Sequence, residues 1–418
     1  MLCISVVGPD YHSACMQIEK ALPFADVIEL CFDVDENAIA KLRGRYDIPF
    51  ISKLNACTEY TDVAWNKEDI QFQGSSEVIV SYHDYDSTPD DLLALYREMK
   101  KTAADIIKIA TYARSGIDAL RMLCFVKRVA DGGDKVIGIC MGPDGVATRI
   151  LAPVVGGWGT FACLEEDERT APGQLTVRQL VEKYNYRNLS RKTKILGVIG
   201  DPVNRSSSPS IHNGFYHDNN IDAVYVPFRI GHCDVEEFFV LAEELGVYGV
   251  SVTMPIKEAV VTGSVVNTLA FYNGKVEGYN TDGNGAWDAI AKRISSLHGK
   301  RAVIIGAGGA AKAIVVEGKK RGVDISVLNR TLSLGIKGLE CMEHESSRGY
   351  DILIQCTPVF GRIIDKKNIL KDAVIMDIIT NPRETQLLHD AKDLGCEIIV
   401  GMEMLINQAK EQHKIWFA

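Results

Sequence analysis

Short apolar runs recur through the first half of the chain and alternate with stretches of helical periodicity. Eight of these runs have the length of buried strands, at residues 2–7, 26–32, 49–54, 61–65, 78–83, 105–110, 135–141 and 160–164. Strands that alternate with helices usually pair in parallel. Eight such units predict a (β/α)8 barrel over residues 1–190, with its chemistry at the carboxyl ends of the strands.

Charged side chains interrupt the apolar pattern at or near the predicted strand ends. They are Glu29, Lys53, His83, Lys108 and Arg149. A buried strand rarely ends in a charge that has neither a partner nor a function. These side chains therefore mark the carboxyl end of the predicted barrel as a candidate site.

Lys108 stands inside an apolar strand, between Ile107 and Ile109. Burial of its amine would lower its pKa and leave it free to attack a ketone. His83, near the end of another strand, could then move protons on the resulting imine. A snorkelling lysine and a solvated histidine fit the same pattern, and both interpretations stay open on composition alone.

A second pattern starts at residue 301, where an apolar strand, a glycine turn, a helix and another strand follow within about thirty residues. Gly306, Gly308 and Ala311 fill the G-x-G-x-x-G/A pattern of a dinucleotide-binding turn. The turn predicts a Rossmann-type domain that holds a pyrophosphate at a helix N-terminus. A flavodoxin-like turn that binds nothing would share these glycines.

The second strand of this unit, residues 325–328, leads into Asn329, Arg330 and Thr331. An NAD-binding domain would carry an acidic side chain here for the ribose hydroxyls. A guanidinium instead suits a 2′-phosphate, to which it can donate two parallel hydrogen bonds. Arg330 therefore predicts NADP as the cofactor.

The chain between the two patterns holds candidate polar chemistry. A short basic stretch at 187–193 predicts a domain boundary. Lys257 lies on a strand-to-helix turn and Asp282 in a glycine-rich turn. In one cleft they could pass a proton to an alkoxide while a nicotinamide passes a hydride, although surface charges would look the same. The serines at 206–208 precede a helix, where hydroxyls are also ordinary caps.

Composition narrows the class of protein. A chain of 418 residues is too long for one core, so two or three domains are expected. The net charge of -9 argues against nucleic acid as the main partner.

The spacing of cysteines and histidines predicts no metal site, and the scattered thiols indicate a reducing compartment. No apolar stretch has the length of a membrane span, so we expect no membrane segment and a cytoplasmic location.

The segments HDYDSTP, ADIIKIA, MGPDGVATR, TFA and TAPGQ give the first half its resemblance to type I 3-dehydroquinate dehydratase. That family is a barrel that removes water from 3-dehydroquinate with a Schiff-base lysine and a histidine. The resemblance implies that Lys108 forms the imine, His83 acts as acid and base, and Arg149 holds the substrate carboxylate. It also implies four further substrate-binding residues, Glu29, Phe161, Thr170 and Gln174.

The first half also departs from that family. Cys31 and Leu54 stand where the family carries substrate-binding cations, and no glutamate that would orient the histidine is found. The departures predict an active but weak dehydratase with a raised KM.

The second half resembles shikimate dehydrogenase in GDPVNRSSSPSIHN, VTMPIK, NTDGNGAW, GAGGAA, NRT and GMEMLINQA. The resemblance implies Lys257 and Asp282 as the catalytic pair. It implies substrate binding by Ser206, Ser208, Thr253, Asn267 and Gln408, and an NADP site lined by Gly306, Ala307, Gly308, Gly309, Ala310, Asn329, Arg330, Thr331 and Gly401. A substrate-binding domain of residues 194–285 plus 401–418 would enclose a cofactor domain of residues 286–400.

Together the halves resemble the bifunctional 3-dehydroquinate dehydratase/shikimate dehydrogenase family. We expect small-molecule substrates and two consecutive reactions: dehydration of 3-dehydroquinate to 3-dehydroshikimate, and reduction of 3-dehydroshikimate to shikimate by NADPH. Two alternatives stay open. One is a shikimate or quinate dehydrogenase whose dehydratase half is weak or inactive, and the other is a regulator that senses a metabolite without turnover. The sequence does not predict the oligomeric state.

Overall fold

A computed structural model describes residues 1–53, 57–65, 76–204, 206–261, 264–272, 274–330 and 337–417. These residues form two compact units, Met1–Val250 and Ser251–Ala418. The boundary between the units falls within one strand, β11 (Val247–Val252).

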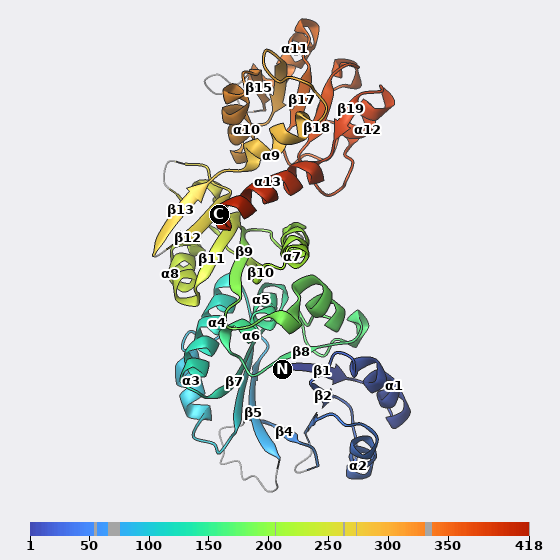
Figure 1. The fold of residues 1–418 in the computed structure, drawn as a ribbon, viewed down its shortest axis with the longest axis vertical. Coiled ribbons are helices and arrows are strands. Elements are labelled where there is room, and N and C mark those ends of the chain that lie inside the picture. Colours follow the sequence, from blue (N-terminus) through green and yellow to red (C-terminus); the bar gives the residue numbers. More distant parts are fainter. Residues whose placement is uncertain are drawn as a thin grey trace. The chain divides into compact units, whose positions relative to one another are not determined.

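Eight parallel strands build most of the first unit (Figure 1). They are β1 (Leu2–Val6), β2 (Val27–Leu30), β3 (Phe50–Ser52), β4 (Tyr60–Ala64), β5 (Glu77–Asp84), β6 (Ile106–Tyr112), β7 (Lys135–Met141) and β8 (Thr160–Ala162). Their order is β7-β6-β5-β4-β3-β2-β1-β8. The amide of Trp158 donates to the carbonyl of Val136 at 2.8 Å, which links the segment before β8 to β7. The sheet is thus a nearly closed barrel, and the eight predicted strands are confirmed.

Helices connect these strands, and aspartates start several of them. The helices are α1 (Tyr11–Ala21), α2 (Glu36–Arg45), α3 (Leu92–Met99), α4 (Gly116–Asp131), α5 (Val146–Ile150) and α6 (Ala152–Val155), with the short turns η1 (Pro143–Gly145), η2 (Glu166–Glu168), η3 (Gln179–Lys183) and η4 (Tyr186–Asn188). Asp10, Asp35 and Asp91 each accept a hydrogen bond from the amide three residues ahead. Such caps satisfy donors that the first helical turn leaves unpaired.

Alternation along the strands divides the barrel interior into layers. One apolar cluster contains Cys3, Val27, Ile51, Ile79, Ile106, Ile137, Ile139 and Phe161. Side chains two residues apart on a strand lie on the same face of the sheet. Ser5, Glu29, Ser81 and Lys108 follow Cys3, Val27, Ile79 and Ile106 at this spacing. A polar layer therefore lies above the apolar one, toward the carboxyl ends of the strands.

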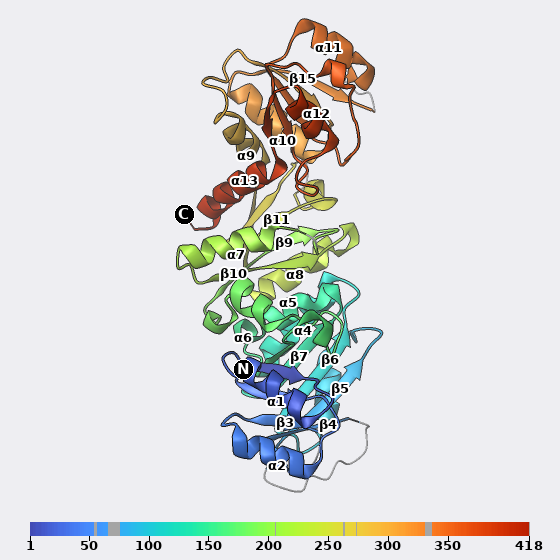
Figure 2. The ribbon, with the colours of Figure 1, turned by 90° about the vertical axis from the view of Figure 1, so that its right-hand side faces the viewer.

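The first unit ends with β9 (Lys194–Gly200), α7 (Ser208–Asp218), β10 (Ala223–Arg229), η5 (His232–Asp234), α8 (Val235–Leu245) and β11. The strand order here is β10-β9-β11. Helix α7 packs on β9 and β10 (Figure 2), and α8 packs against α4 of the barrel. The residues after the barrel are therefore part of the same compact unit as the barrel itself.

The second unit begins with the end of β11, the turn η6 (Ile256–Glu258) and the antiparallel hairpin of β12 (Thr268–Tyr272) and β13 (Lys275–Tyr279). Helix α9 (Asp282–Ile290) leads into a parallel sheet ordered β16-β15-β14-β17-β18-β19. Its strands are β14 (Arg301–Ile305), β15 (Asp324–Asn329), β16 (Lys337–Gly338), β17 (Ile352–Gln355), β18 (Val374–Asp377) and β19 (Glu397–Ile399). The remaining helices are α10 (Gly309–Lys320), η7 (Leu339–Cys341), α11 (Met342–Arg348), η8 (Lys366–Asn368), α12 (Gln386–Asp393) and α13 (Gly401–Trp416).

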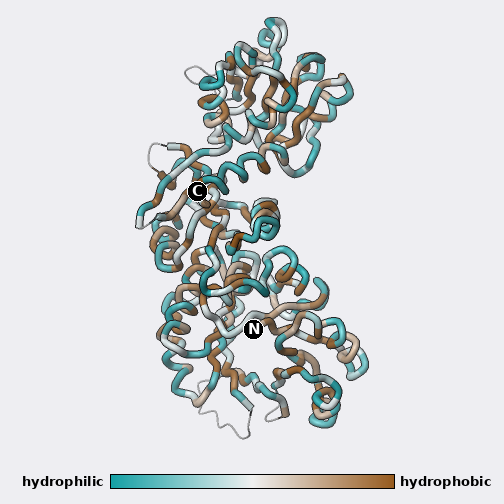
Figure 3. Tube along the Cα trace, in the orientation of Figure 1, coloured by the Kyte–Doolittle hydropathy of each residue, from teal (hydrophilic) through white to brown (hydrophobic). Residues whose placement is uncertain are grey.

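Helices cover both faces of this sheet, because its strands are apolar on both sides. On β14, Ala302 and Ile304 face α9, α10 and α13, whereas Val303 and Ile305 face α11 and α12. Hydrophobic residues accordingly concentrate along the strands in Figure 3. A parallel sheet covered on both faces is the doubly wound arrangement that the glycine pattern predicts. Among the described helices, none is long and apolar enough to cross a membrane.

Candidate functional sites

The polar layer of the barrel surrounds Lys108. Its ammonium Nζ lies 2.8 Å from Oδ2 of Asp62 and 3.8 Å from Oε1 of Glu29. It also lies 4.2 Å from the centre of the Phe161 ring. The lysine side chain is only 8% exposed, so these charges meet with little screening by solvent. Burial, two carboxylates and an aromatic face define the environment of this amine.

The predicted lowering of the Lys108 pKa is wrong for this structure. Burial acts in the predicted direction, but the carboxylates of Asp62 and Glu29 outweigh it and raise the pKa above its usual range. The prediction considered the apolar neighbours in the strand and omitted partners from other strands. Lys108 therefore rests as an ammonium that must lose a proton before it can attack a carbonyl.

A hydrogen-bonded chain joins Glu29 to the segment after β8. The hydroxyl of Ser5 donates to Glu29 at 2.6 Å, and Nε2 of Gln174 donates to Ser5 at 3.3 Å. The backbone amide of Thr170 in turn donates to Oε1 of Gln174 at 2.7 Å. The structure thus connects Glu29, Gln174 and Thr170, which lie far apart in the sequence, at one end of the barrel.

Arg149 lies on α5, not near a strand end as the sequence suggested. Its side chain is buried, and Nη1 donates to the carbonyl of Phe161 at 3.4 Å. Its Nε has no hydrogen-bond partner among the described residues. Burial lowers the pKa of this guanidinium to about 10. A buried arginine with an unused donor is suited to bind an anion such as a carboxylate.

His83 lies near the end of β5, where its ring stacks on Tyr85 with the centroids 6.2 Å apart. Its side chain is exposed, yet its pKa is lowered, first by desolvation and then by the charge of Lys108. The ring is consequently neutral at pH 7 and can accept a proton. Lys53 is exposed, and Leu54 lies outside the described residues.

Asp62 is the residue of this site that sequence reasoning missed. It follows Tyr60 on the same face of β4, and Tyr60 packs against the apolar cluster of the barrel. A carboxylate at that spacing inside a strand gives the same signal that singled out Lys108. The carboxylate pKa is lowered: burial alone would raise it, but the ammonium of Lys108 outweighs that effect.

The second unit brings Lys257 and Asp282 into contact. Lys257 Nζ forms an ion pair with Oδ2 of Asp282, and Nδ2 of Asn267 donates to Oδ1 at 2.8 Å. The same Asn267 amide group donates to Oε1 of Gln408 at 3.2 Å. Thr281, which the sequence reading passed over, donates to that oxygen at 3.2 Å as well. Four predicted residues thus form one cluster in which each oxygen of Asp282 has a donor.

The glycine turn lies beside this cluster. Gly306 has φ of +113°, a conformation that favours glycine. A Cβ at Gly308 would meet nothing within 4 Å, so its backbone is open to a ligand. A Cβ at Gly309 would lie 3.4 Å from Cδ of Lys257. The turn can therefore admit a pyrophosphate next to the lysine, and these residues fit a dinucleotide.

The other predicted cofactor-binding residues lie on or next to β15, α10 and α13. These elements flank the glycine turn or carry a residue of the Asp282 cluster. Arg330 is exposed directly after β15, and Thr331 lies outside the described residues. Gly401 starts α13, where a Cβ would lie 2.4 Å from the carbonyl oxygen of Ile379. Glycine is therefore needed for this helix to pack, and the helix carries Gln408 to the cluster. Ala307 and Ala310 stand in the turn and in the first turn of α10, and Asn329 ends β15.

Ser206 and Ser208 lie on one segment, and Thr253 lies on another. Oγ of Ser206 accepts a hydrogen bond from the amide of Ser208 at 3.2 Å, whereas Ser207, the N-cap residue of α7, makes no side-chain capping hydrogen bond. Ser208 is buried in the first turn of α7. Thr253 is half-buried and directly follows β11 in the second unit. The two serines belong to the first unit.

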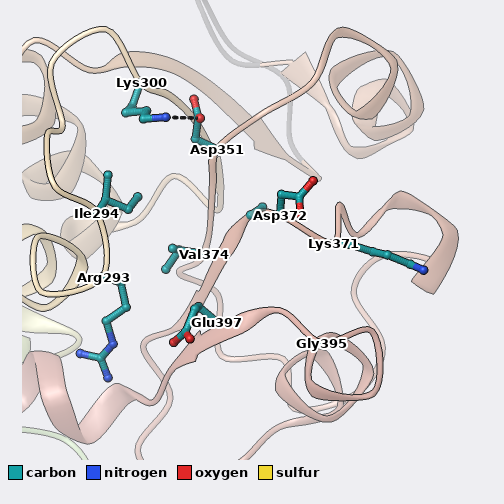
Figure 4. A pocket seen from close by; sticks show the side chains of 10 residues that line it. Arg293, Ile294, Lys300, Asp351, Lys371, Asp372, Val374, Gly395 and Glu397 are labelled. Carbon is teal, nitrogen blue, oxygen red and sulfur yellow. Dashed lines mark hydrogen bonds and ion pairs between the residues drawn. The ribbon is translucent and has the colours of Figure 1, made fainter.

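A cavity of about 320 Å³ lies at the amino ends of the strands of the doubly wound sheet, whereas the glycine turn lies at their carboxyl ends. Residues at the amino ends of β14, β17, β18 and β19 line it, and Figure 4 shows the ion pair of Lys300 with Asp351 at 2.7 Å. Ligands of such sheets bind at the carboxyl ends, where Gly306 lies. The cavity is therefore separate from the dinucleotide turn. In the part of the chain that the structure describes, no cluster of His, Cys, Asp or Glu could hold a metal ion.

Comparisons with known proteins give matches in both halves. Residues 53–191 match the type I 3-dehydroquinase family, and residues 198–280 match the shikimate dehydrogenase substrate binding domain. The shikimate biosynthesis protein AroDE of Chlamydia pneumoniae is 32% identical, with 100% of this chain and 95% of that protein covered.

A second relative and one solved structure extend the comparison. The chloroplastic bifunctional 3-dehydroquinate dehydratase/shikimate dehydrogenase of Arabidopsis thaliana is 32% identical, with 82% of this chain and 63% of that protein covered. The crystal structure of a shikimate dehydrogenase in complex with NADP+ matches with a TM-score of 0.51 and 33% identity. The match covers 55% of this chain and 91% of the chain in that crystal structure.

Proposed function

This chain belongs to the family of bifunctional 3-dehydroquinate dehydratase/shikimate dehydrogenases, and from that premise we propose how its two sites work. The protein dehydrates 3-dehydroquinate and reduces 3-dehydroshikimate to shikimate, with NADP as cofactor. The observation that carries both assignments is the likeness to a bifunctional relative over the full chain, with a buried lysine site in one half and a Lys–Asp pair in the other.

In the dehydratase site, the Lys108 ammonium first loses a proton, which ends on the water that leaves when the imine forms. The neutral amine then attacks the ketone carbon of 3-dehydroquinate, a C=N bond replaces the C=O bond, and water leaves. The resulting iminium is a cation beside Asp62 and Glu29, whose carboxylates stabilise it. The lowered pKa of His83 keeps its ring neutral at pH 7, so the ring is free to accept a proton.

The iminium withdraws electrons from the neighbouring carbon, so a proton there becomes acidic. After His83 removes that proton, the electron pair forms the new C=C bond, the C–O bond breaks, and His83 returns the proton to the hydroxyl group, which leaves as water. Hydrolysis of the imine releases 3-dehydroshikimate and restores Lys108. Arg149 would hold the substrate carboxylate throughout, which its buried unpaired Nε supports. Glu29, Phe161, Thr170 and Gln174 would complete the pocket.

In the dehydrogenase site, Lys257 and Asp282 would manage the proton. Bound NADPH supplies the hydride for the ketone of 3-dehydroshikimate. The Lys257 ammonium would donate its proton to the alkoxide oxygen, and Asp282 would hold the ammonium in place. Asn267 fixes the other oxygen of Asp282, so the carboxylate cannot turn away from the lysine. Ser206, Ser208, Thr253 and Gln408 would bind the substrate's hydroxyl groups and carboxylate.

The residues around the glycine turn would hold the cofactor. Gly306, Ala307, Gly308, Gly309 and Ala310 would accept its pyrophosphate. Asn329, Arg330 and Thr331 would bind the adenosine 2′-phosphate, and Gly401 would line the site from the start of α13. The open backbone at Gly308 and the exposed Arg330 guanidinium support this assignment.

One assay tests both halves together. Wild-type protein supplied with 3-dehydroquinate and NADPH should oxidise NADPH, because the first reaction produces the substrate of the second. Lys108→Ala should abolish oxidation from 3-dehydroquinate and keep it from 3-dehydroshikimate. Asp282→Asn should reduce oxidation from both substrates and still release 3-dehydroshikimate. A wild type that binds these compounds without turnover would be a regulator and would contradict the proposal.

We also propose a cytoplasmic location. Five buried cysteines carry free thiols: Cys3, Cys15, Cys124, Cys140 and Cys163. Free thiols persist in a reducing compartment. Alkylation of the purified protein under denaturing, non-reducing conditions should modify these five thiols; recovery of any of them in a disulfide from cells would argue against this location.

A further inference from the structure

The turn after β7 of the barrel meets the segment that follows β9. Its central residue, Asp144, lies in η1 and is buried. Both of its oxygens bind groups outside the barrel. Oδ2 accepts a hydrogen bond from Nε of Arg229 at 2.9 Å, and Oδ1 accepts one from Nδ2 of Asn204 at 3.1 Å. One buried carboxylate thus connects two separate segments that come after the barrel.

Arg229 is held from several sides at the end of β10. Its Nη2 lies 2.8 Å from Oδ2 of Asp144, and its Nη1 lies 3.4 Å from Oδ2 of Asp201. A Cβ at Gly116, the first residue of α4, would lie 2.7 Å from the carbonyl oxygen of Arg229. The barrel backbone therefore touches the backbone of β10 directly, and the guanidinium has little freedom to move away from Asp144.

Asp201 and Asn204 belong to the segment between β9 and α7, which leads to Ser206 and Ser208. Asn204 comes two residues before Ser206, and the Ser206 amide donates to the carbonyl of Val203 at 3.0 Å. The barrel carboxylate therefore fixes this segment at two points, through Asn204 directly and through Arg229 to Asp201. A segment held at two points keeps its hydroxyls in one arrangement before a ligand binds.

We propose that Asp144, a residue of the dehydratase half, is a positioning residue for the dehydrogenase reaction. It holds the segment that presents Ser206 and Ser208 to the substrate, and so lowers the KM for 3-dehydroshikimate. The inference rests on the proposed substrate-binding role of these serines. We expect it to act on substrate binding, because the side-chain partners of Asp144 are Arg229 and Asn204, which lead to the serine segment of the same unit.

Asp144→Asn tests the inference, since it keeps the shape of the side chain and removes its charge. Hydrogen bonds to an ionised group are about twice as strong as neutral ones, so the KM for 3-dehydroshikimate should rise roughly three- to tenfold. The values of kcat and of KM for NADPH should stay within about twofold. An unchanged KM for 3-dehydroshikimate would overturn the inference.

Arg121→Met is the matched control. Arg121 pairs with Glu237 at 2.6 Å and so joins α4 to α8, on the same side of the barrel but without a link to the serine segment. This variant should leave the KM for 3-dehydroshikimate unchanged. An equal rise in both variants would show that docking of the barrel in general matters, and would overturn a specific role for Asp144.

Two further variants keep the test decisive. Asn204 is exposed, so Asn204→Ala should fold even if Asp144→Asn does not, and it should raise the same KM about two- to threefold. The double variant Asp144→Asn/Arg229→Gln should raise this KM by less than the product of the two single effects, because each single change already weakens the Asp144–Arg229 pair; fully additive effects would overturn the inference. Wild-type protein without turnover would instead refute the proposed function itself.

Discussion

The reactivity of Lys108 is decided by residues remote from it in the sequence. Ile107 and Ile109 made the lysine look desolvated, and it is buried. The carboxylates of Asp62 on β4 and Glu29 on β2 determine its protonation state. The sequence of the Lys108 strand alone does not reveal these partners. The pair of carboxylates keeps the resting amine protonated and later stabilises the iminium. The same two negative charges thus favour both the resting ammonium of Lys108 and the iminium cation formed during the reaction.

Removal of the nearer carboxylate should move the pH dependence of imine formation. Because Asp62 is the larger of the two raising effects, Asp62→Asn should lower the Lys108 pKa and shift the curve of covalent trapping against pH to lower pH. Glu29→Gln should shift it less, since Glu29 is farther from the ammonium. The measurement is borohydride trapping of the 3-dehydroquinate adduct from pH 5 to 10. Asp134→Asn, which removes the exposed partner of Lys100, serves as control; an unshifted Asp62→Asn curve would contradict the role of Asp62.

Arg330 should decide the choice between cofactors. A charge-assisted bidentate contact contributes about 1.5–3 kcal/mol, so Arg330→Ala should weaken NADPH binding by roughly 10- to 100-fold and NADH binding little. Titration of each cofactor into the protein measures both affinities. Arg362→Ala removes another exposed arginine of the same unit and should change neither. Equal losses for the two cofactors would remove Arg330 from the 2′-phosphate site.

At the scale of elements, periodicity predicted most of the architecture. The eight barrel strands and the strand–glycine–helix–strand unit are confirmed within a few residues at their ends. Buried strands and glycine turns are local signals, so one window of sequence contains them. Contacts between distant elements are not local, which is why the pairing of Asp62 with Lys108 and that of Thr281 with Gln408 were not predicted.

The packing of α9 against α13 positions Gln408 and has no room for a larger residue. A Cβ at Gly285 would lie 2.8 Å from Cβ of Gln408, so Gly285→Ala should cost about 1–3 kcal/mol of stability through overpacking. The displaced Gln408 should also raise the KM for 3-dehydroshikimate. Gly214 is exposed in α7 with nothing within 4 Å of a Cβ, so Gly214→Ala should stabilise the protein by about 0.5–1 kcal/mol. Thermal unfolding compares the two; stabilisation by Gly285→Ala would contradict the packing argument.

At the scale of the whole molecule, the compact unit that contains the barrel extends beyond the last barrel strand, β8. The sequence predicts a domain boundary near residue 190, and the compact unit continues to Val250. Helix α8 buries Phe238, Ala242 and Leu245, and it packs on α4. The pair of Arg128 with Glu244 spans the same two helices. We therefore expect the stability of the barrel to depend on α8, a helix that the sequence assigns to the other half.

Truncation should reveal that dependence. A fragment of residues 1–193 loses α8 and exposes the apolar face of α4, whereas a fragment of residues 1–250 keeps the interface. Burial of one large apolar side chain contributes about 1.5–3 kcal/mol, and several are lost here, so the shorter fragment should unfold at least about 4 °C lower. The exposed ion pairs add little to this difference. The two fragments are compared by thermal unfolding and by borohydride trapping with 3-dehydroquinate. Equal stability would place the folding boundary near residue 190, as the sequence predicts, and would show that the α4–α8 contact joins two independent halves.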